Sequence, residues 1–275
     1  MATAPIMKFS VLPQRLSWAL AAIVIPLVNA QTTQDTNVHA WFMYFGDHPL
    51  SDKWGIHLEG QIRRANTVLT WQQLLLRPGV NYQLTPRVLF TAGYGYVRSW
   101  PYGGYPAKAA FPEHRFYEQA LIKHKVSPLA IQHRLRLEQR LVGVVPAPEA
   151  EVEGWQTRHR FRYMLRGDIP LPIQTNGQQR FGIALYDEVF WQFGANRGPR
   201  SFDQNRAYGA LTYKLTPSNR LELGYLYQYI PQRNGLIVEH NHTLQFAWFS
   251  TIPLKPRGPH LRRSQSELAS PRSTV

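Results

Sequence analysis

Two stretches near the middle of the chain alternate between apolar and charged residues over more than ten positions. The charged face is formed by Arg134, Arg136, Glu138 and Arg140 in Ile131–Leu141, and by Arg158, Arg160 and Arg162 in Trp155–Arg166. A period of two indicates β-strands, because successive side chains of a strand point to opposite faces. Strands of this length, with aromatic and aliphatic residues opposite the charges, are typical of a sheet between lipid and a water-filled lumen. The pattern therefore predicts a transmembrane β-barrel.

The N-terminus has the features of a secretory signal peptide. Lys8 and Arg15 precede an apolar stretch, Leu16–Val28, which ends at a small-x-small cleavage site, Val28-Asn29-Ala30. The apolar stretch is too short for a spanning helix, so residues 1–30 are predicted to direct export and then to be removed. No other segment is apolar enough to cross a bilayer as a helix. The exported chain is therefore expected either to stay soluble or to close into a barrel.

Composition narrows the chemistry that the chain can perform and the partners that it can have. The sequence contains no cysteine, which excludes disulfides and thiolate chemistry. The formal net charge of +14 includes Lys8 and Arg15, which leaves +12 on the mature chain (14 − 2). In a cytosolic protein this charge would suggest nucleic acid as a partner, but export argues against nucleic acid. We expect outer-membrane lipids, lipopolysaccharide and small anionic solutes instead, unless the arginines simply pair with glutamates inside a lumen.

The same alternation divides the rest of the mature chain into candidate strands, most of them 10–14 residues long. They are Val38–Phe45, Trp54–Arg64, Trp71–Gln83, Val88–Val97, His114–Val126, Ile131–Gly143, Trp155–Gly167, Arg180–Phe193, Gln204–Leu215, Arg220–Ile230 and Glu239–Thr251. Short proline-containing turns alternate with long loops, as the short periplasmic turns and long external loops of outer-membrane barrels do. Eleven strands cannot close an antiparallel barrel with both termini in the periplasm, so either Val38–Phe45 is an extra segment or a twelfth strand exists. Residues 31–253 are predicted to form an all-β fold, a closed antiparallel transmembrane barrel of 10–12 strands.

The C-terminal residues 254–275 differ from the rest of the chain. Their basic residues are Lys255, Arg257, Arg262, Arg263 and Arg272, and Glu267 is the one acidic residue among them. A segment with high charge, few apolar residues, and proline and serine between the charges is predicted to be a disordered tail. It follows the last strand and is therefore expected in the periplasm.

Several short motifs distributed along the mature chain are specific enough to compare with known families. They include Leu75-Leu76-Arg77-Pro78-Gly79, Glu113-His114-Arg115, Arg160-Phe161-Arg162-Tyr163, Asp187-Glu188-Val189-Phe190 and Phe202-Asp203-Gln204-Asn205-Arg206. Together with the stretch from His133 to Arg140 they resemble the domain of unknown function 2490 family of Gram-negative outer-membrane proteins. The resemblance covers nearly all of the mature chain. It implies a barrel in the cell outer membrane and implies no activity.

The main candidate site is the set of charged residues predicted on the inward faces of the middle strands. It comprises Arg115, Glu118, Arg134, Arg136, Glu138, Arg140, Arg158, Arg160, Arg162 and Glu188. Adjacent strands bring such residues close enough for cross-strand pairing. Glu118 is out of phase with Arg115, which indicates a bulge or a misplaced register. Two interpretations remain open: arginine–carboxylate pairs that fill a narrow lumen, or a basic constriction that selects anions.

Two other motifs suggest binding sites. Asp203, Asn205 and Arg206 follow a long loop, where they could bind a cation or a sugar at the barrel mouth or simply end the loop. His240 and His242 share one face of a predicted strand, but a zinc site needs a third ligand that the sequence does not supply. No metal or organic cofactor is predicted.

The pattern favours a non-enzymatic barrel, either a small channel with an arginine- and glutamate-lined lumen or a plugged structural barrel. The alternative is a barrel enzyme that modifies lipid or lipopolysaccharide, which would need a serine or threonine nucleophile beside a histidine. The sequence has no Gly-x-Ser-x-Gly motif, and Ser99 is the serine that such an enzyme would use. A soluble periplasmic β-protein is disfavoured by the strand lengths and by the predicted outward aromatic residues.

Overall fold

The computed structural model of the chain describes residues 32–175 and 177–254, which form a closed β-barrel. The predicted signal peptide and almost all of the predicted tail lie outside the described residues. The strands of the barrel are β1 (Thr33–Pro49), β2 (Trp54–Ala65), β3 (Thr70–Thr85), β4 (Val88–Ser99), β5 (Phe111–Val126), β6 (Leu129–Val144), β7 (Gly154–Pro170), β10 (Phe181–Phe193), β11 (Phe202–Thr216), β12 (Asn219–Pro231) and β13 (Ile237–Ser250). A small hairpin of β8 (Gln174–Thr175) and β9 (Gln178–Gln179) lies in the connection between β7 and β10. The predicted all-β closed barrel of 10–12 strands is confirmed, with eleven barrel strands in the described part of the chain.

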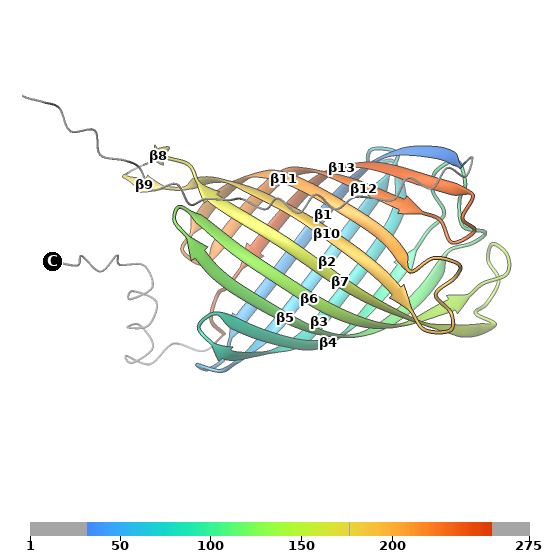
Figure 1. Cartoon of the computed structure of the whole chain (residues 1–275), viewed down its shortest axis with the longest axis horizontal. Coiled ribbons are helices and arrows are strands. Elements are labelled where there is room, and N and C mark those ends of the chain that lie inside the picture. Colours follow the sequence, from blue (N-terminus) through green and yellow to red (C-terminus); the bar gives the residue numbers. More distant parts are fainter. Residues whose placement is uncertain (1–31, 176, 255–275) are drawn as a thin grey trace, which may run out of the picture. The chain divides into compact units, whose positions relative to one another are not determined.

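The barrel closes through one parallel pair of strands. Its order is β1-β13-β12-β11-β10-β7-β6-β5-β4-β3-β2, and β2 returns to β1. Every neighbouring pair is antiparallel, as expected, except β1 and β13, which run parallel from Thr33↔Ile237 to Gly46↔Ser250 (Figure 1). A parallel seam is what lets an odd number of strands close, so the segment Val38–Phe45 is a full barrel strand. Within the described residues no twelfth strand is needed.

The two ends of the barrel differ. One end, here called the long-loop end, carries the connections after β2, β4, β6, β10 and β12, and the opposite, short-turn end carries the connections after β1, β3, β5, β7 and β11. Because of the parallel seam, β1 starts at the long-loop end and β13 finishes at the short-turn end (Figure 1). The turn between β3 and β4 shows how tightly the short connections close: the Thr85 hydroxyl accepts hydrogen bonds from the Arg87 and Val88 amides.

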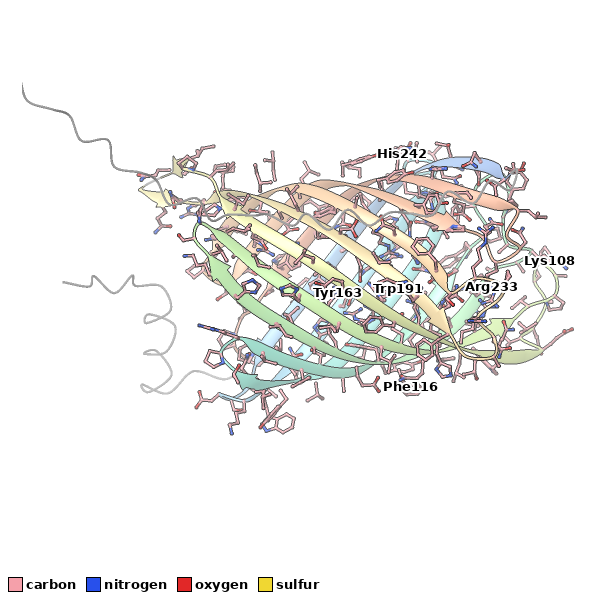
Figure 2. The ribbon with its side chains drawn as sticks, in the orientation of Figure 1. Lys108, Phe116, Tyr163, Trp191, Arg233 and His242 are labelled. Carbon is pink, nitrogen blue, oxygen red and sulfur yellow. The ribbon has the colours of Figure 1, made fainter. Side chains whose placement is uncertain are left out.

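Apolar side chains cover the outer face of the barrel. Leu223 of β12 and Leu244 of β13 are 56% and 58% exposed. Phe116 and Trp191 also lie on the outer surface (Figure 2). Polar and charged side chains at the alternate positions point inward and are buried, which reverses the usual arrangement of a soluble protein. The two-residue period of the sequence thus sorts the side chains into an apolar exterior and a polar interior.

The interior itself has two unlike walls. The inner faces of β1 and β11–β13 carry a buried apolar cluster of Trp41, Met43, Tyr208, Ala210, Leu226 and Ala247. The inner faces of β5–β7 carry mainly arginine and glutamate. The lumen therefore has a charged wall at β5–β7 and a buried apolar cluster on β1 and β11–β13, although β11–β13 also carry inward charges such as Arg206 and Glu222. No helix among the described residues is long and apolar enough to cross a membrane.

Candidate functional site

A cavity of about 860 Å³ occupies the lumen. Tyr102 and Arg233 line it at the long-loop end, and Lys123 and Lys214 line it at the short-turn end. The cavity therefore reaches residues at both ends of the barrel, and the charged side chains described below border it.

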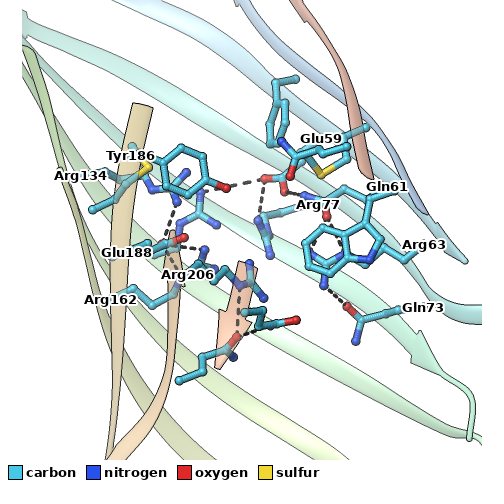
Figure 3. Close-up of a pocket in the computed structure, with 18 of the residues that line it drawn as sticks. Glu59, Gln61, Arg63, Gln73, Arg77, Arg134, Arg162, Tyr186, Glu188 and Arg206 are labelled. Carbon is cyan, nitrogen blue, oxygen red and sulfur yellow. Dashed lines mark hydrogen bonds and ion pairs between the residues drawn. The ribbon is translucent and has the colours of Figure 1, made fainter. Parts of the chain in front are cut away.

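Buried glutamates, each shared by two arginines, are the main contacts of the charged wall. Glu138, with an exposed fraction of 0%, accepts hydrogen bonds from Arg160 Nη2 at 2.6 Å and from Arg162 Nη1 at 2.7 Å. Glu188 accepts hydrogen bonds from Arg162 Nε at 2.9 Å and from Arg134 Nη2 at 2.7 Å (Figure 3). The Arg162 guanidinium thus joins two carboxylates. Such charge-assisted bonds satisfy groups that would be very costly to bury alone.

Two further glutamates repeat this arrangement at other positions of the lumen. Glu113 accepts from Arg115 Nε and Arg140 Nε, each at 2.5 Å. Glu222 is paired with Arg166 and with Arg220, whose Nη2 lies 3.0 Å away. Each of these carboxylates therefore contacts two guanidinium groups, as Glu138 and Glu188 do.

Some ion pairs join strands that are not neighbours and so cross part of the lumen. Arg160 of β7 donates to Asp203 of β11 at 3.0 Å. Glu59 of β2 accepts from Arg77 of β3 at 2.6 Å (Figure 3). Glu59 also lies 4.0 Å from Arg136 of β6. These contacts narrow the cavity between the walls.

The structure brings most of the predicted lumen residues together, including Arg158, whose Nε donates to Gln156 at 2.9 Å. Glu118 is the exception: it is exposed on the outer face, where it accepts a hydrogen bond from Gln139 at 3.1 Å, so its placement in the lumen is wrong. The inward positions of β5 follow a regular two-residue period through Glu113, Arg115, Tyr117 and Gln119, with no bulge to turn Glu118 inward. The carboxylate that pairs with Arg115 is Glu113, which the sequence assigned to the preceding loop.

The predicted mouth motif does not form one site. Asp203 and Arg206 point into the lumen, whereas Asn205 points outward and donates to Asp187 at 3.0 Å. A register shift between β10 and β11 at Phe190/Trp191 leaves Asp203 unpaired in the ladder and lets it join the inward side chains. The three residues therefore lie on both faces of β11.

Two lumen arginines that the sequence did not single out as a pair lie against the same tryptophan. The Arg63 and Arg206 guanidinium carbons are 3.8 and 5.2 Å from the centre of the Trp41 ring. Arg63 belongs to β2 and Arg206 to β11, so β1, β13 and β12 separate them around the barrel. The alternation shows that each faces inward, but only closure of the barrel shows that they meet.

The loop between β4 and β5 reaches across the long-loop end of the cavity. The Tyr102 hydroxyl donates to Glu239 of β13 at 2.7 Å, and the Gly104 amide donates to Asp35 of β1 at 3.3 Å. Gly103 has a φ of +77°, and a Cβ there would lie 2.8 Å from Asp35 and Asn37 oxygens, so glycine allows this close approach. Burial and the neighbouring Glu239 carboxylate raise the pKa of the Tyr102 phenol. Tyr102 therefore remains a hydrogen-bond donor at neutral pH.

The residues weighed for metal binding or catalysis have other partners. His240 and His242 lie on the outer face, with their Nδ1 atoms each 2.5 Å from the hydroxyls of Tyr227 and Tyr225. Ser99 faces the lumen and accepts a hydrogen bond from Gln73 at 2.8 Å. Among residues 32–175 and 177–254, no three histidine or acidic side chains converge as a metal site, and no histidine bonds to Ser99.

The chain matches a known protein family. A family model described as "Protein of unknown function (DUF2490)" matches residues 38–239. An uncharacterized protein of Methylorubrum extorquens is 27% identical over 188 residues, which are 66% of this chain and 75% of that protein. A solved structure of the NanC porin in a rhombohedral crystal form aligns with a TM-score of 0.45 and 12% identity, covering 78% of this chain and 99% of the porin chain. The match to the family model spans most of the chain, as the sequence motifs predicted, and the chain belongs to the DUF2490 family of proteins of unknown function.

Proposed function

We propose that this protein resides in the outer membrane and lets small anionic solutes pass through its lumen. The apolar exterior suits contact with outer-membrane lipids and lipopolysaccharide, and the polar interior suits a wet passage. The cavity that reaches residues at both ends supplies the path.

The observation that carries the proposal is the sharing of each central glutamate by two arginines. Glu113, Glu138, Glu188 and Glu222 each contact two guanidinium groups. Some of these arginines are shared as well: Arg162 contacts both Glu138 and Glu188, Arg160 also pairs with Asp203, and Asp168 pairs with Arg166 and Arg220. The arginines of this network still outnumber its carboxylates, so an anion that enters meets a net positive wall.

Basic side chains that have no carboxylate partner within residues 32–175 and 177–254 occur near both ends of the path. At the long-loop end, Arg233 donates to Gln192 at 3.1 Å and Arg158 bonds to Gln156, so both groups interact with amide oxygens. Burial and the nearby Arg140 lower the pKa of Arg233. At the short-turn end, Lys123 and Lys214 line the cavity. Positive charge at both ends would draw anions in and exclude cations.

A plugged structural barrel is the second candidate, and the ion pairs that cross the lumen favour it. Proteoliposomes that contain the refolded protein and enclose either a chloride-sensitive or a potassium-sensitive dye separate the two. The proposal predicts chloride entry that clearly exceeds potassium entry. Entry of neither ion would support the plugged barrel, and potassium entry as fast as chloride entry would contradict anion passage.

A further inference from the structure

Arg63 and Arg206 differ from the other central arginines in what holds them. Gln61 Oε1 accepts from Arg63 Nε at 2.9 Å and from Nη2 at 2.6 Å, and Gln73 Oε1 accepts from Nη1 at 2.8 Å (Figure 3). Gln204 Oε1 accepts from Arg206 Nε at 3.1 Å. In the part of the chain that the structure describes, neither guanidinium has a carboxylate oxygen within the 4.0 Å that defines the ion pairs of this lumen. Amide oxygens orient the two groups but do not neutralise them.

Trp41 contacts both guanidinium groups, and Arg206 also lies over Phe190 at 4.7 Å. The Trp41 indole Nε1 donates to Gln72 at 2.7 Å, which anchors the ring against the two arginines. A cation over an aromatic face is attracted by the ring and keeps its full charge. The arrangement therefore holds two cations next to each other without an acid between them.

Both guanidinium groups retain hydrogen-bond donors, and both residues line the cavity. Arginine has five N–H donors, and the amide bonds to Arg63 and Arg206 use only part of them. Each arginine is 9% exposed and lines the cavity. Glu59 and Glu188 act on Arg63 and Arg206 only from beyond ion-pair distance. Charges buried this deeply without a carboxylate in direct contact are costly, so an anion bound here would relieve a penalty that the protein otherwise bears.

We infer that Arg63, Arg206 and Trp41 form a binding site for a small dicarboxylate in the lumen. A carboxylate matches the fork of one guanidinium, so a dicarboxylate can offer one carboxylate to each of the two guanidinium groups and balance both charges. The two guanidinium carbons lie 3.8 and 5.2 Å from the centre of the Trp41 ring, so they are at most 9.0 Å apart, the sum of these distances. A short dicarboxylate can reach both groups over this distance. The site rests on the proposed function in one respect: the bound dicarboxylate is one of the solutes that the lumen admits.

Calorimetric titration of the refolded full chain in detergent tests the site, with sodium succinate and sodium propionate compared at constant ionic strength. We expect succinate to bind at least tenfold more tightly than propionate. Arg63→Gln and Arg206→Gln should each raise the dissociation constant of succinate at least tenfold. Arg63→Lys should also weaken binding, since lysine keeps the charge but lacks the planar fork.

Arg64→Gln is the matched control, because this substitution removes the same charge from the next position in β2. The Arg64 guanidinium donates to the Val68 and Leu69 carbonyls of the following loop. Migration of heated and unheated samples on a detergent gel checks that each variant folds.

Equal binding of succinate and propionate, or succinate binding that Arg206→Gln and Arg63→Lys leave intact, would overturn the site. Succinate binding that depends on these arginines in a protein without chloride flux would refute the proposed passage and leave the site standing. Chloride flux in a protein whose succinate binding the variants leave unchanged would refute the site and leave the proposed passage standing.

Discussion

Glu138 of β6, which is completely buried, accepts hydrogen bonds from Arg160 of β7 at 2.9 and 2.6 Å. The same carboxylate also accepts from Arg162 at 2.7 Å. One carboxylate thus compensates two guanidinium groups on the neighbouring strand, and the stability of the charged wall depends on it.

Replacing Glu138 with glutamine keeps the shape of the side chain and removes this compensation. Arg160 keeps Asp203 and Arg162 keeps Glu188 as a carboxylate partner, so we expect Glu138→Gln to lower the free energy of unfolding by about 1–3 kcal/mol, the usual cost of losing one partner of a buried hydrogen bond. Urea titration of the refolded protein, followed by the mobility difference between folded and unfolded bands, measures the change. Glu118→Gln is the control, because Glu118 lies on the outer face, where within the described residues its side chain hydrogen-bonds only to Gln139. Equal destabilisation by both variants would show that Glu138 has no special role in the lumen.

The parallel seam predicts which residues of β1 and β13 lie side by side. Val38 is in register with His242, and both side chains point outward. The chain contains no cysteine, so Val38→Cys combined with His242→Cys should form a disulfide on mild oxidation, detected as a mobility shift that reductant abolishes. Val38→Cys with Leu244→Cys is the control, because the second position is two residues farther along the strand, about 6–7 Å. A bond in the control pair and none in the registered pair would refute the seam.

Tyr102 ties the β4–β5 loop to β13 through its hydrogen bond to Glu239. Tyr102→Phe removes that bond, so the loop should swing more freely and single-channel conductance should rise, with more current noise. Tyr105→Phe is the control, because the Tyr105 phenol forms no hydrogen bond within the described residues and its loop contact is made by its backbone oxygen. Identical conductance in the two variants would show that the Tyr102 contact does not limit the path.

Local patterns predicted the walls of the barrel well. The alternation in β6 and β7 identified the inward arginines because side-chain direction in a strand depends only on position. The same rule identified Glu118 as out of phase, and the mistake was to place it in the lumen instead of moving the start of β5 back to include Glu113.

Features that depend on closure could not be read from the sequence. The meeting of Arg63 and Arg206 at Trp41 joins strands with three others between them, and no sequence spacing encodes that distance. The parallel seam was missed because strand direction was inferred from connections, and no connection joins β1 to β13. Asp203 turns inward through a register shift, which a strict period of two does not predict.

The reversal potential of the refolded protein in a planar bilayer under a potassium chloride gradient tests anion passage most directly. Anion passage predicts a potential of the sign set by chloride permeation. The potential should shift toward zero when Arg158→Gln and Arg233→Gln are combined, since these arginines lie at the long-loop end and have no carboxylate partner among the residues that the structure describes. Arg64→Gln should leave the potential unchanged. A potential of the sign set by potassium, or a bilayer that stays silent with correctly folded protein, would contradict it.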